Sequence, residues 1–356
     1  MMLPRAARLA LVRNPVTGGE LDAAWMTDAL ARRSGGARVL TVRTEPMPVR
    51  DALFTGPDHV YLTWDRDGLP PSLVAKAVAE DHAAAELGAA MGVFQREAGF
   101  YDALAFSCGV RVADPWFTWS RPDSTLLILE DLSGLRPGDG RDGLEVDEVA
   151  ASLEALAVMH ARWWGGADLA DLWFLRRIDT ARLSLLDRQC GALVDTFLDR
   201  CAIGWDDEQV ELVRAVAASP STWWQPMFEG GVTLVQGDVK PGNLFFDDGN
   251  EPVFVDWQAV SLASPALDVA SILGCGLVPE VRHAAQDELI ELYEAALRGH
   301  GIDLDRSAWR VQLMQAAHAM VAPCISASRV ADDRLAATLA VTARRRADLA
   351  TSLRQD

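Results

Sequence analysis

Hydrophobic and polar residues follow two different patterns along the chain, one typical of strands and one typical of helices. In the first third, apolar residues recur at helical spacing over residues 21–33, which predicts a short helix that stops at Gly35 and Gly36. Alternating or continuous apolar runs bounded by turn-forming residues then predict strands at residues 38–43, 51–64, 72–78 and 125–129.

Helical spacing dominates the later part of the chain. A helix over residues 83–104 is expected inside the strand-rich part, and another is expected to begin at the N-cap Asp147 and to stop at Gly165 and Gly166. Further helices are predicted at residues 169–219, with breaks near Gly191 and Gly204, and at 264–270, 286–299, 307–319 and 332–353. The pattern therefore predicts a mixed N-terminal part and a mainly helical C-terminal part.

Residues 236–258, QGDVKPGNLFFDDGNEPVFVDWQ, interrupt this helical part with a hairpin pattern. Residues 244–246 and 252–257 are apolar, and the stretch between them, Asp247 to Asn250, carries turn chemistry. Asp-Gly tolerates the positive φ angle that tight turns demand, so the centre of the turn is predicted at Gly249 and Asn250.

The hairpin carries polar residues where its strands begin and end. Asn243 and Asp256 lie about equally far from the turn centre, so we expect their side chains to face each other at the open end. Both offer oxygen ligands, which Mg²⁺ prefers. Asp238 follows the apolar run 232–235 and could orient an attacking hydroxyl and accept its proton. The alternative is a surface hairpin whose acidic residues are simply solvated.

Lys76 lies inside an apolar strand, where a charged side chain is costly without an anionic partner. Glu97 is the expected partner, because it lies beside the apolar face of the helix predicted at residues 83–104. Glu86 is the second choice. The alternative is a lysine that extends to solvent and a solvated glutamate.

The spacing Asp-x-Lys-x-x-Asn, followed by a strand that ends in Asp, matches the catalytic and metal loops of kinases. This segment resembles the aminoglycoside phosphotransferase and choline kinase superfamily, whose loop usually reads HGDxxxxN. It is most similar to the ecdysteroid kinase-like branch, in which Trp or Phe and then Gln follow the metal-binding Asp. Gln236 stands where that superfamily usually has histidine, and its amide could brace the loop in the same way.

The resemblance implies a two-lobed, protein-kinase-like α+β fold. Residues 1–131 would form a nucleotide-binding lobe with an antiparallel sheet, and residues 132–356 a mostly helical lobe for catalysis and substrate binding. It implies ATP and Mg²⁺ as cofactors and a hydroxyl group of a small molecule as acceptor, such as an amino-sugar, an aminocyclitol, an antibiotic or another metabolite. An ATP-dependent phosphotransferase is therefore expected.

The same resemblance assigns residue roles. Asp238 and Lys240 would be catalytic, with Lys240 contacting the transferring phosphoryl group. Asn243 and Asp256 would bind the metal. Lys76, Glu97, Glu130 and Leu132 would bind the nucleotide, the last two through backbone groups at the adenine. Asp268 would support the catalytic loop. Independently of the resemblance, His160, Trp163, Trp164, Trp223 and Trp224 are expected in the core, because such residue types are more often packed there.

One departure concerns the loop that covers the phosphates. Kinases often use a glycine-rich loop there, whereas residues 50–59 contain only Gly56. This leaves open a pseudokinase that binds a nucleotide or a partner without catalysis. A protein kinase ranks lower, because no Ala-Pro-Glu segment follows Asp256.

Composition limits the remaining possibilities. The 356 residues suffice for two lobes, and 50% are hydrophobic, as in globular proteins. The net charge of −18 argues against nucleic acid as a partner, and no apolar run reaches the length needed to span a membrane. The N-terminal residues lack the continuous apolar stretch of a secretory signal, and the five cysteines form no Cys-x-x-Cys pair. A cytoplasmic protein is expected; its oligomeric state is not predicted.

Overall fold

The computed structural model describes residues 20–47, 54–78, 81–175, 180–229, 231–329, 331 and 333–354. The N-terminal residues, for which no secretory signal is predicted, lie outside these ranges. The chain divides into two compact units. The first ends at Ser107 and resumes over Ala113–Gly134, and the second comprises Cys108–Val112 and the chain from Leu135 onward. The predicted boundary lay after residue 131, with residues 108–112 on its N-terminal side.

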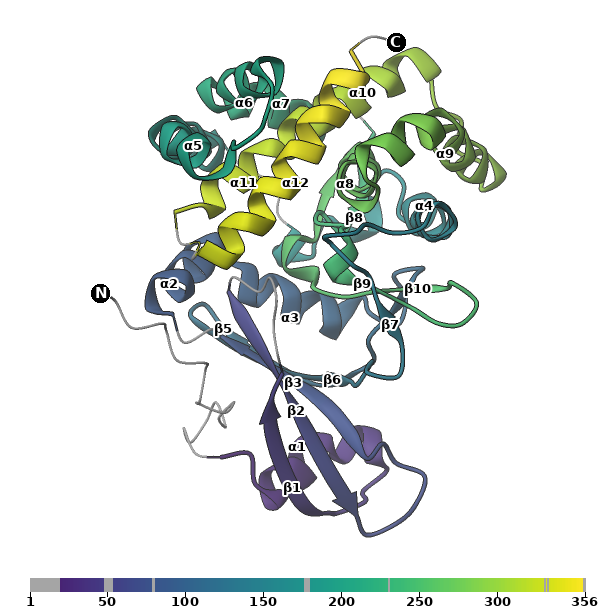
Figure 1. Cartoon of the computed structure of the whole chain (residues 1–356). Coiled ribbons are helices and arrows are strands. Elements are labelled where there is room, and N and C mark those ends of the chain that lie inside the picture. The colour runs from purple at the N-terminus through teal and green to yellow at the C-terminus, as the bar shows by residue number, and fades with distance from the viewer. Residues whose placement is uncertain are drawn as a thin grey trace, which may run out of the picture. The chain divides into compact units, whose positions relative to one another are not determined.

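The first unit is built on a five-stranded antiparallel sheet (Figure 1), as predicted. Sheet order differs from chain order, because β6, the last of these strands along the chain, lies between β3 and β5. In sheet order the strands are β1 (Val39–Pro46), β2 (Thr55–Trp64), β3 (Ser72–Val78), β6 (Ser124–Glu130) and β5 (Pro115–Arg121).

Helix α1 (Ala23–Ser34) packs on one face of this sheet and forms a hydrophobic core with it. Asp22 caps the first turn by accepting a hydrogen bond from the amide of Trp25, and Gly35 ends the helix with φ 61°. Met26 and Leu30 are fully buried against strand residues such as Leu73. The helix therefore begins and ends close to where the sequence pattern places it.

The helix expected over residues 83–104 is instead two helices, α2 (His82–Met91) and α3 (Val93–Ala103). Gly92 separates them, with φ 70°, and its amide donates to carbonyls of the last turn of α2. A left-handed residue cannot continue a right-handed helix, so the chain changes direction there. Periodicity alone did not reveal this break.

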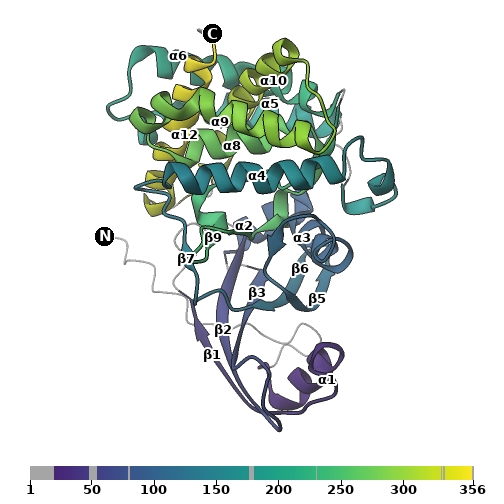
Figure 2. The same ribbon diagram turned by 90° about the vertical axis from the view of Figure 1, so that its right-hand side faces the viewer.

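Helices dominate the second unit, and α8 lies at its centre, with every residue buried. Helices α4, α10 and α12 pack around it, and Figure 2 shows α4 and α9 side by side. The α-helices are α4 (Val146–Arg162), α5 (Thr180–Cys201), α6 (Asp207–Ala218), α7 (Pro220–Trp224), α8 (Ala266–Gly276), α9 (Pro279–Gly299), α10 (Arg306–Ala319), α11 (Val321–Ala327) and α12 (Asp333–Ser352).

The second unit also contains short strands and 3₁₀ turns. A four-stranded sheet has the order β4-β10-β9-β7, and β11 pairs with β8. The strands are β4 (Arg111–Val112), β7 (Arg136–Pro137), β8 (Thr233–Val235), β9 (Leu244–Phe246), β10 (Pro252–Phe254) and β11 (Ser261–Ala263). The 3₁₀ turns are η1 (Ala167–Leu169), η2 (Trp173–Leu175), η3 (Gln225–Phe228), η4 (Pro241–Asn243) and η5 (Trp257–Ala259).

Several local expectations need correction. The N-cap of α4 is Glu145, not Asp147, because Glu145 and Glu148 form a reciprocal capping box. Helix α5 passes through Gly191 without a break, whereas Gly204, with φ 79°, does lie between helices. The paired tryptophans at 163–164 and 223–224 are only half-buried; Trp257 and Trp309 are the fully buried ones.

Within the described ranges, no helix combines the length and the apolar character needed to cross a membrane. All five cysteines are free and buried.

Candidate active site

The hairpin predicted at residues 244–257 is present, with β9 antiparallel to β10. Phe246 pairs with Pro252, so residues 247–251 form a five-residue loop centred on Gly249. Asn250, with φ 62°, adopts the left-handed conformation that had been assigned to Asp-Gly. The register therefore places Asn243 opposite Val255, whose amide donates to the Asn243 carbonyl at 3.0 Å. Asp256 lies one residue farther along than predicted.

Asp256 lies two residues after the end of β10, in a conformation that is unusual for a residue with a side chain. Its φ is 62°, and the chain turns there from the strand into η5. The backbone carbonyls of Val255 and Asp256 accept hydrogen bonds from Gln236 Nε2 at 3.0 and 3.1 Å. Gln258 Nε2 donates to Asp256 Oδ2 at 3.2 Å. These contacts fix the backbone and the carboxylate at a strained position, as is common at functional sites.

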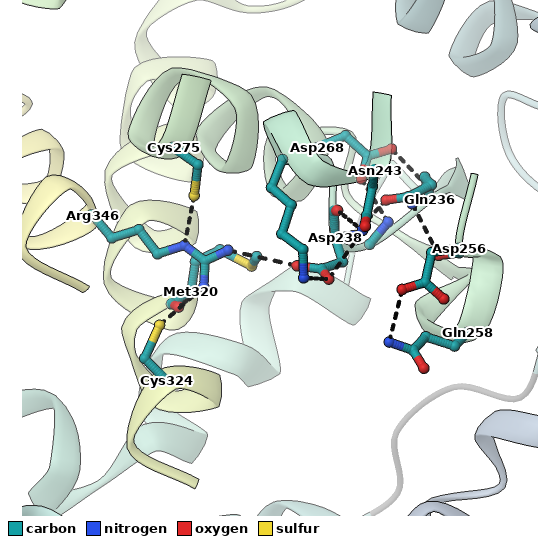
Figure 3. A network of polar contacts seen from close by, with 12 residues as sticks. Gln236, Asp238, Asn243, Asp256, Gln258, Asp268, Cys275, Met320, Cys324 and Arg346 are labelled. Carbon is teal, nitrogen blue, oxygen red and sulfur yellow. Dashed lines mark hydrogen bonds and ion pairs between the residues drawn. The ribbon is translucent and has the colours of Figure 1, made fainter. Parts of the chain in front are cut away.

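The loop that begins at Gln236 is anchored on Asp268, near the start of α8 (Figure 3). Asp268 is fully buried and accepts hydrogen bonds from the amides of Gln236 and Gly237, at 2.8 and 2.7 Å. His160 Nε2 lies 3.2 Å from the same carboxylate, and His160 Nδ1 lies 2.8 Å from the Tyr293 hydroxyl. The predictions that Asp268 supports the loop and that His160 is a hydrogen-bonded core residue are both confirmed.

Tyr293 completes this buried network as a neutral hydroxyl. Burial raises its pKa well above the ordinary value, and the negative charge of Asp268 adds to the effect. The network can therefore hold the loop without itself carrying a second negative charge.

Gly237 and Gln236 set the course of the loop toward Asp238. Gly237 has φ 84°, and a Cβ atom at this position would lie 2.5 Å from the carbonyl oxygen of Ala259, so only glycine fits. Gln236 Oε1 accepts a hydrogen bond from the Asp238 amide at 2.7 Å. The glutamine amide thus joins the loop to the end of the hairpin, as predicted for a residue in the usual place of histidine.

Asp238, the predicted base, is surrounded by hydrogen-bond donors and cations (Figure 3). Lys240 Nζ donates to Asp238 Oδ2 at 2.6 Å, and Arg346 Nη2 lies 3.7 Å from Asp238 Oδ1. Asn243 Nδ2 donates to the backbone carbonyl of Asp238 at 2.9 Å and to its Oδ2 at 3.3 Å. The structure therefore brings Asp238, Lys240 and Asn243 together.

The charge balance favours ionised side chains here. Burial alone would lower the pKa of Lys240, but the carboxylates of Asp238 and Asp256 outweigh it and raise the pKa above its ordinary value. Burial likewise opposes the charge of Arg346, but Cys275, Cys324 and Asp238 together raise the pKa of its guanidinium.

Arg346 is the residue of this site that the sequence analysis missed. It lies on α12, 108 residues after Asp238 along the chain. The residue spacing within the catalytic loop therefore gives no hint of it. One signal exists, because Arg346 shares the apolar face of α12 with Ala343, Ala347 and Ala350, which are all fully buried. A charged residue on such a face requires a buried partner.

Asn243 and Asp256 fit a magnesium site in their chemistry. Asn243 directs Nδ2 to Asp238, so its Oδ1 points away from that carboxylate. One amide oxygen and one carboxylate match Mg²⁺, which commonly takes few protein ligands together with water and substrate phosphates. Within the described ranges, no group of three or more His, Cys, Asp or Glu residues could hold a metal ion, so an all-protein cage of that kind is not formed there.

In the first unit, the predicted pair of Lys76 and Glu97 is present. Lys76 Nζ on β3 donates to Glu97 Oε1 on α3 at 2.7 Å, and the glutamate is 1% exposed. Glu86, the second choice, is exposed and lies 3.2 Å from His82, so it is not the partner. A buried glutamate that holds a strand lysine is the arrangement that kinases use beside the nucleotide phosphates.

The other predicted nucleotide-binding residues are placed as follows. Glu130 ends β6, and its amide donates to the Asp114 carbonyl at 2.8 Å, so an adenine contact could not use that amide. Leu132 is buried just beyond the strand. Of the glycine-poor residues 50–59, those from 50 to 53 lie outside the described ranges, and Gly56 lies within β2, opposite Ala77.

Comparisons with known proteins indicate which family and which fold this chain resembles. The model of the ecdysteroid kinase-like family matches residues 177–305, a stretch that includes Asp238, Asn243, Asp256 and Asp268. A search of curated protein sequences found no match. The resemblance predicted from the catalytic loop is therefore confirmed by the family model and by the solved structures that share the fold.

Three solved structures illustrate that fold. An ethanolamine kinase from Plasmodium vivax has a TM-score of 0.53 at 10% identity, over 88% of this chain and 81% of its own. A spectinomycin phosphotransferase in complex with ADP and spectinomycin has a TM-score of 0.51 at 12% identity, over 90% and 95%. A GDP complex of an aminoglycoside 2′-phosphotransferase has a TM-score of 0.51 at 11% identity, over 91% and 98%. The chain has a kinase-like phosphotransferase fold.

Proposed function

We propose that this chain is a small-molecule kinase, which transfers the γ-phosphoryl group of ATP to a hydroxyl group with the help of Mg²⁺. The acceptor class is an amino-sugar, an aminocyclitol, an antibiotic or another metabolite. The observation that carries the proposal is the loop in which Asp238, Lys240 and Asn243 contact one another while Gln236 ties that loop to Asp256.

In this proposal Asp238 receives the acceptor hydroxyl, orients its oxygen toward the phosphoryl group and takes its proton. Lys240 has three donors, so it can hold Asp238 and contact a phosphoryl oxygen at the same time. Phosphoryl transfer asks for little covalent chemistry from the protein, and positioning together with charge neutralisation supplies most of the rate.

Asn243 and Asp256 would hold Mg²⁺ through their side-chain oxygens. When bound, the ion neutralises negative charge that develops on the phosphate oxygens during transfer. The contacts of Gln258 to the Asp256 carboxylate and of Asn243 Nδ2 to Asp238 set both ligands before the ion arrives. Hydrogen bonds to the ligating side chains orient metal ligands in this way in many proteins.

Lys76 would neutralise nucleotide phosphate charge, held in place by Glu97. Because Glu97 is almost fully buried, it fixes the ammonium group of Lys76 in one position. Glu130 and Leu132 would contact the adenine through backbone groups. The Glu130 amide is not used for this contact, because it donates to the Asp114 carbonyl within the first unit.

The similar structures support a small acceptor. The three proteins are named as a spectinomycin phosphotransferase, an ethanolamine kinase and an aminoglycoside phosphotransferase. At 10–12% identity they show the fold, and the choice of acceptor in this chain is part of the proposal.

An acceptor screen tests the proposal. Purified protein is incubated with Mg²⁺ and either ATP or GTP, in separate series, over amino-sugars, aminocyclitols, nucleosides, sterols and hydroxy acids. We expect acceptor-dependent release of nucleoside diphosphate and a phosphate monoester of one acceptor class, identified by mass spectrometry. Nucleotide binding without a phosphorylated product from any class would instead favour a pseudokinase.

A further inference from the structure

Arg346 faces the candidate base but has no part in the mechanism described so far. It lies on α12 with 3% of its surface exposed, and its Nη2 is 3.7 Å from Asp238 Oδ1 (Figure 3). Taking a guanidinium out of water is costly unless partners surround it. A buried arginine beside a catalytic loop therefore calls for an account of what it does there.

Three contacts fix the side of the guanidinium that faces away from Asp238. Nε donates to Cys275 Sγ at 3.2 Å, from α8. Nη1 donates to the Met320 carbonyl at 2.7 Å, between α10 and α11, and to Cys324 Sγ at 3.4 Å, on α11. Because the guanidinium is planar and rigid, these contacts leave Nη2 directed at the carboxylate.

The two cations at Asp238 differ in freedom. Lys240 is partly exposed and sits on a flexible four-carbon stem, so its ammonium group can shift toward a phosphoryl group. Arg346 is held by α8 and by the first residues of α11 with their cap, so it cannot follow the substrate. Each oxygen of Asp238 thus has its own cation, one mobile and one fixed.

We infer that Arg346 is a positioning residue, which keeps the Asp238 carboxylate oriented toward the acceptor hydroxyl while Lys240 engages the phosphoryl group. The inference rests on the proposed function. It makes α12, near the C-terminal end of the chain, a structural part of the active site. It also explains why a charged residue occupies the apolar face of that helix.

Kinetics with the identified acceptor provide the first test. Arg346→Met should lower kcat by about 10²-fold, the order of loss that a misplacement of about 1 Å causes, while the KM for ATP stays close to that of the wild type. Arg346→Lys should recover part of kcat, because it keeps a cation but loses the rigid fork.

Arg282→Met is the matched control. Arg282 is also fully buried and also contacts α12, through Asp348 and the Arg345 carbonyl, but none of its polar contacts within the described residues reaches the catalytic loop. It should lower the midpoint of urea unfolding while keeping kcat near that of the wild type. If Arg346→Met and Arg282→Met lose the same fraction of kcat, Arg346 is merely structural and the inference is wrong.

Stability measurements test the pair without any catalysis. Urea unfolding midpoints are compared for Arg346→Met, Asp238→Asn and the double variant. Because Asp238→Asn leaves a buried guanidinium without its carboxylate, the double variant should lose less than the sum of the single losses. Additive losses would overturn the pairing. Arg346→Lys replaces Arg346→Met in this cycle if the latter does not fold.

The two tests separate the inference from the function it rests on. A wild-type protein that phosphorylates no acceptor would refute the proposed function, while the unfolding cycle would still decide whether Arg346 and Asp238 are coupled. An active wild type with additive unfolding losses would refute the role of Arg346 alone.

Discussion

Asp238 lies between a lysine at 2.6 Å and an arginine at 3.7 Å, so its carboxylate is held on both oxygens before any substrate binds. A carboxylate in this setting suits the task of orienting a hydroxyl. The proton can be transferred late in the reaction, because most of the change in charge occurs on the phosphoryl group. Its amide, fixed by Gln236, determines where the side chain starts.

Replacing this carboxylate gives the first prediction. Asp238→Asn should reduce kcat by about 10²-fold or more, as expected when a general base is removed, while ATP still binds. Asp248→Asn, at an exposed carboxylate in the turn of the same hairpin, is the matched control and should leave kcat unchanged. Near-normal turnover by Asp238→Asn, measured as acceptor-dependent ADP release, would show that Asp238 is not the base.

Lys76 and Glu97 give a second prediction at the scale of residues. Lys76→Ala should greatly raise the apparent KM for ATP or abolish activity, because the phosphates lose a cation. Glu97→Ala should cost less, since it positions the lysine without touching phosphate. The double variant should lose less than the sum of both, because the pair acts as one unit. Independent, additive losses in kcat/KM would contradict this role for the 2.7 Å contact.

Individual residues were predictable where their spacing carries chemistry. Asp238, Lys240 and Asn243 lie within six residues of one another, so their meeting follows from the loop alone. Lys76 and Glu97 were found because a lysine in an apolar strand needs an anion. Arg346 was not found, because its partner is brought to it only by the packing of α8, α11 and α12 around the loop.

At the scale of elements, the hairpin positions the candidate metal ligands. The sequence predicted the hairpin and both strands, but it placed Asn243 opposite Asp256. The five-residue loop 247–251 moves the centre of symmetry to Gly249, and Asn243 then faces Val255. Apolar patterns do not encode a shift of this size, because it depends on the conformation of the turn.

The third prediction concerns these ligands. A crystal structure with nucleotide and Mg²⁺ should show Asn243 Oδ1 and an Asp256 oxygen at about 2.1 Å from the ion. The left-handed conformation of Asp256 carries its side chain past the end of β10, which makes this possible despite the shifted register. A metal ion that contacts neither residue would refute the assignment, whatever the activity.

The packing of α7 against α10 gives a fourth prediction. His318 stacks on Trp223 with ring centroids 4.2 Å apart, and burial lowers its pKa to about 4, partly opposed by its contact with the Met314 carbonyl. The unfolded chain binds this proton near pH 6.5, so the folded state loses stability as the pH falls from about 6.5 to about 4. Each pKa unit corresponds to about 1.4 kcal/mol.

Urea unfolding at several pH values tests that expectation. His318→Phe, which keeps a planar ring beside Trp223, should show a weaker loss of stability over this range than the wild type. His300→Gln, at an exposed histidine of the same unit, serves as the control and should follow the wild type. Parallel curves for wild type and His318→Phe would mean that His318 does not titrate in this way.

At the scale of the whole molecule, the fold class was predictable because strand and helix patterns separate along the chain. What the pattern could not supply were interruptions that depend on single φ angles. Gly92 divides one expected helix into two, and Gly191 does not divide another, although both are glycines within helical patterns. The difference lies in the conformation that the neighbouring packing imposes, which composition does not reveal.

The central claim is that this chain binds Mg²⁺ and ATP for phosphoryl transfer, and calorimetric titration of the wild-type protein tests its first requirement directly. We predict Mg²⁺-dependent ATP binding in the micromolar to millimolar range typical of kinases, with strongly reduced affinity in Lys76→Ala. If the wild type binds neither ATP nor GTP at millimolar nucleotide and Mg²⁺, the kinase proposal is wrong, and a binding module without a nucleotide becomes the better account of this fold.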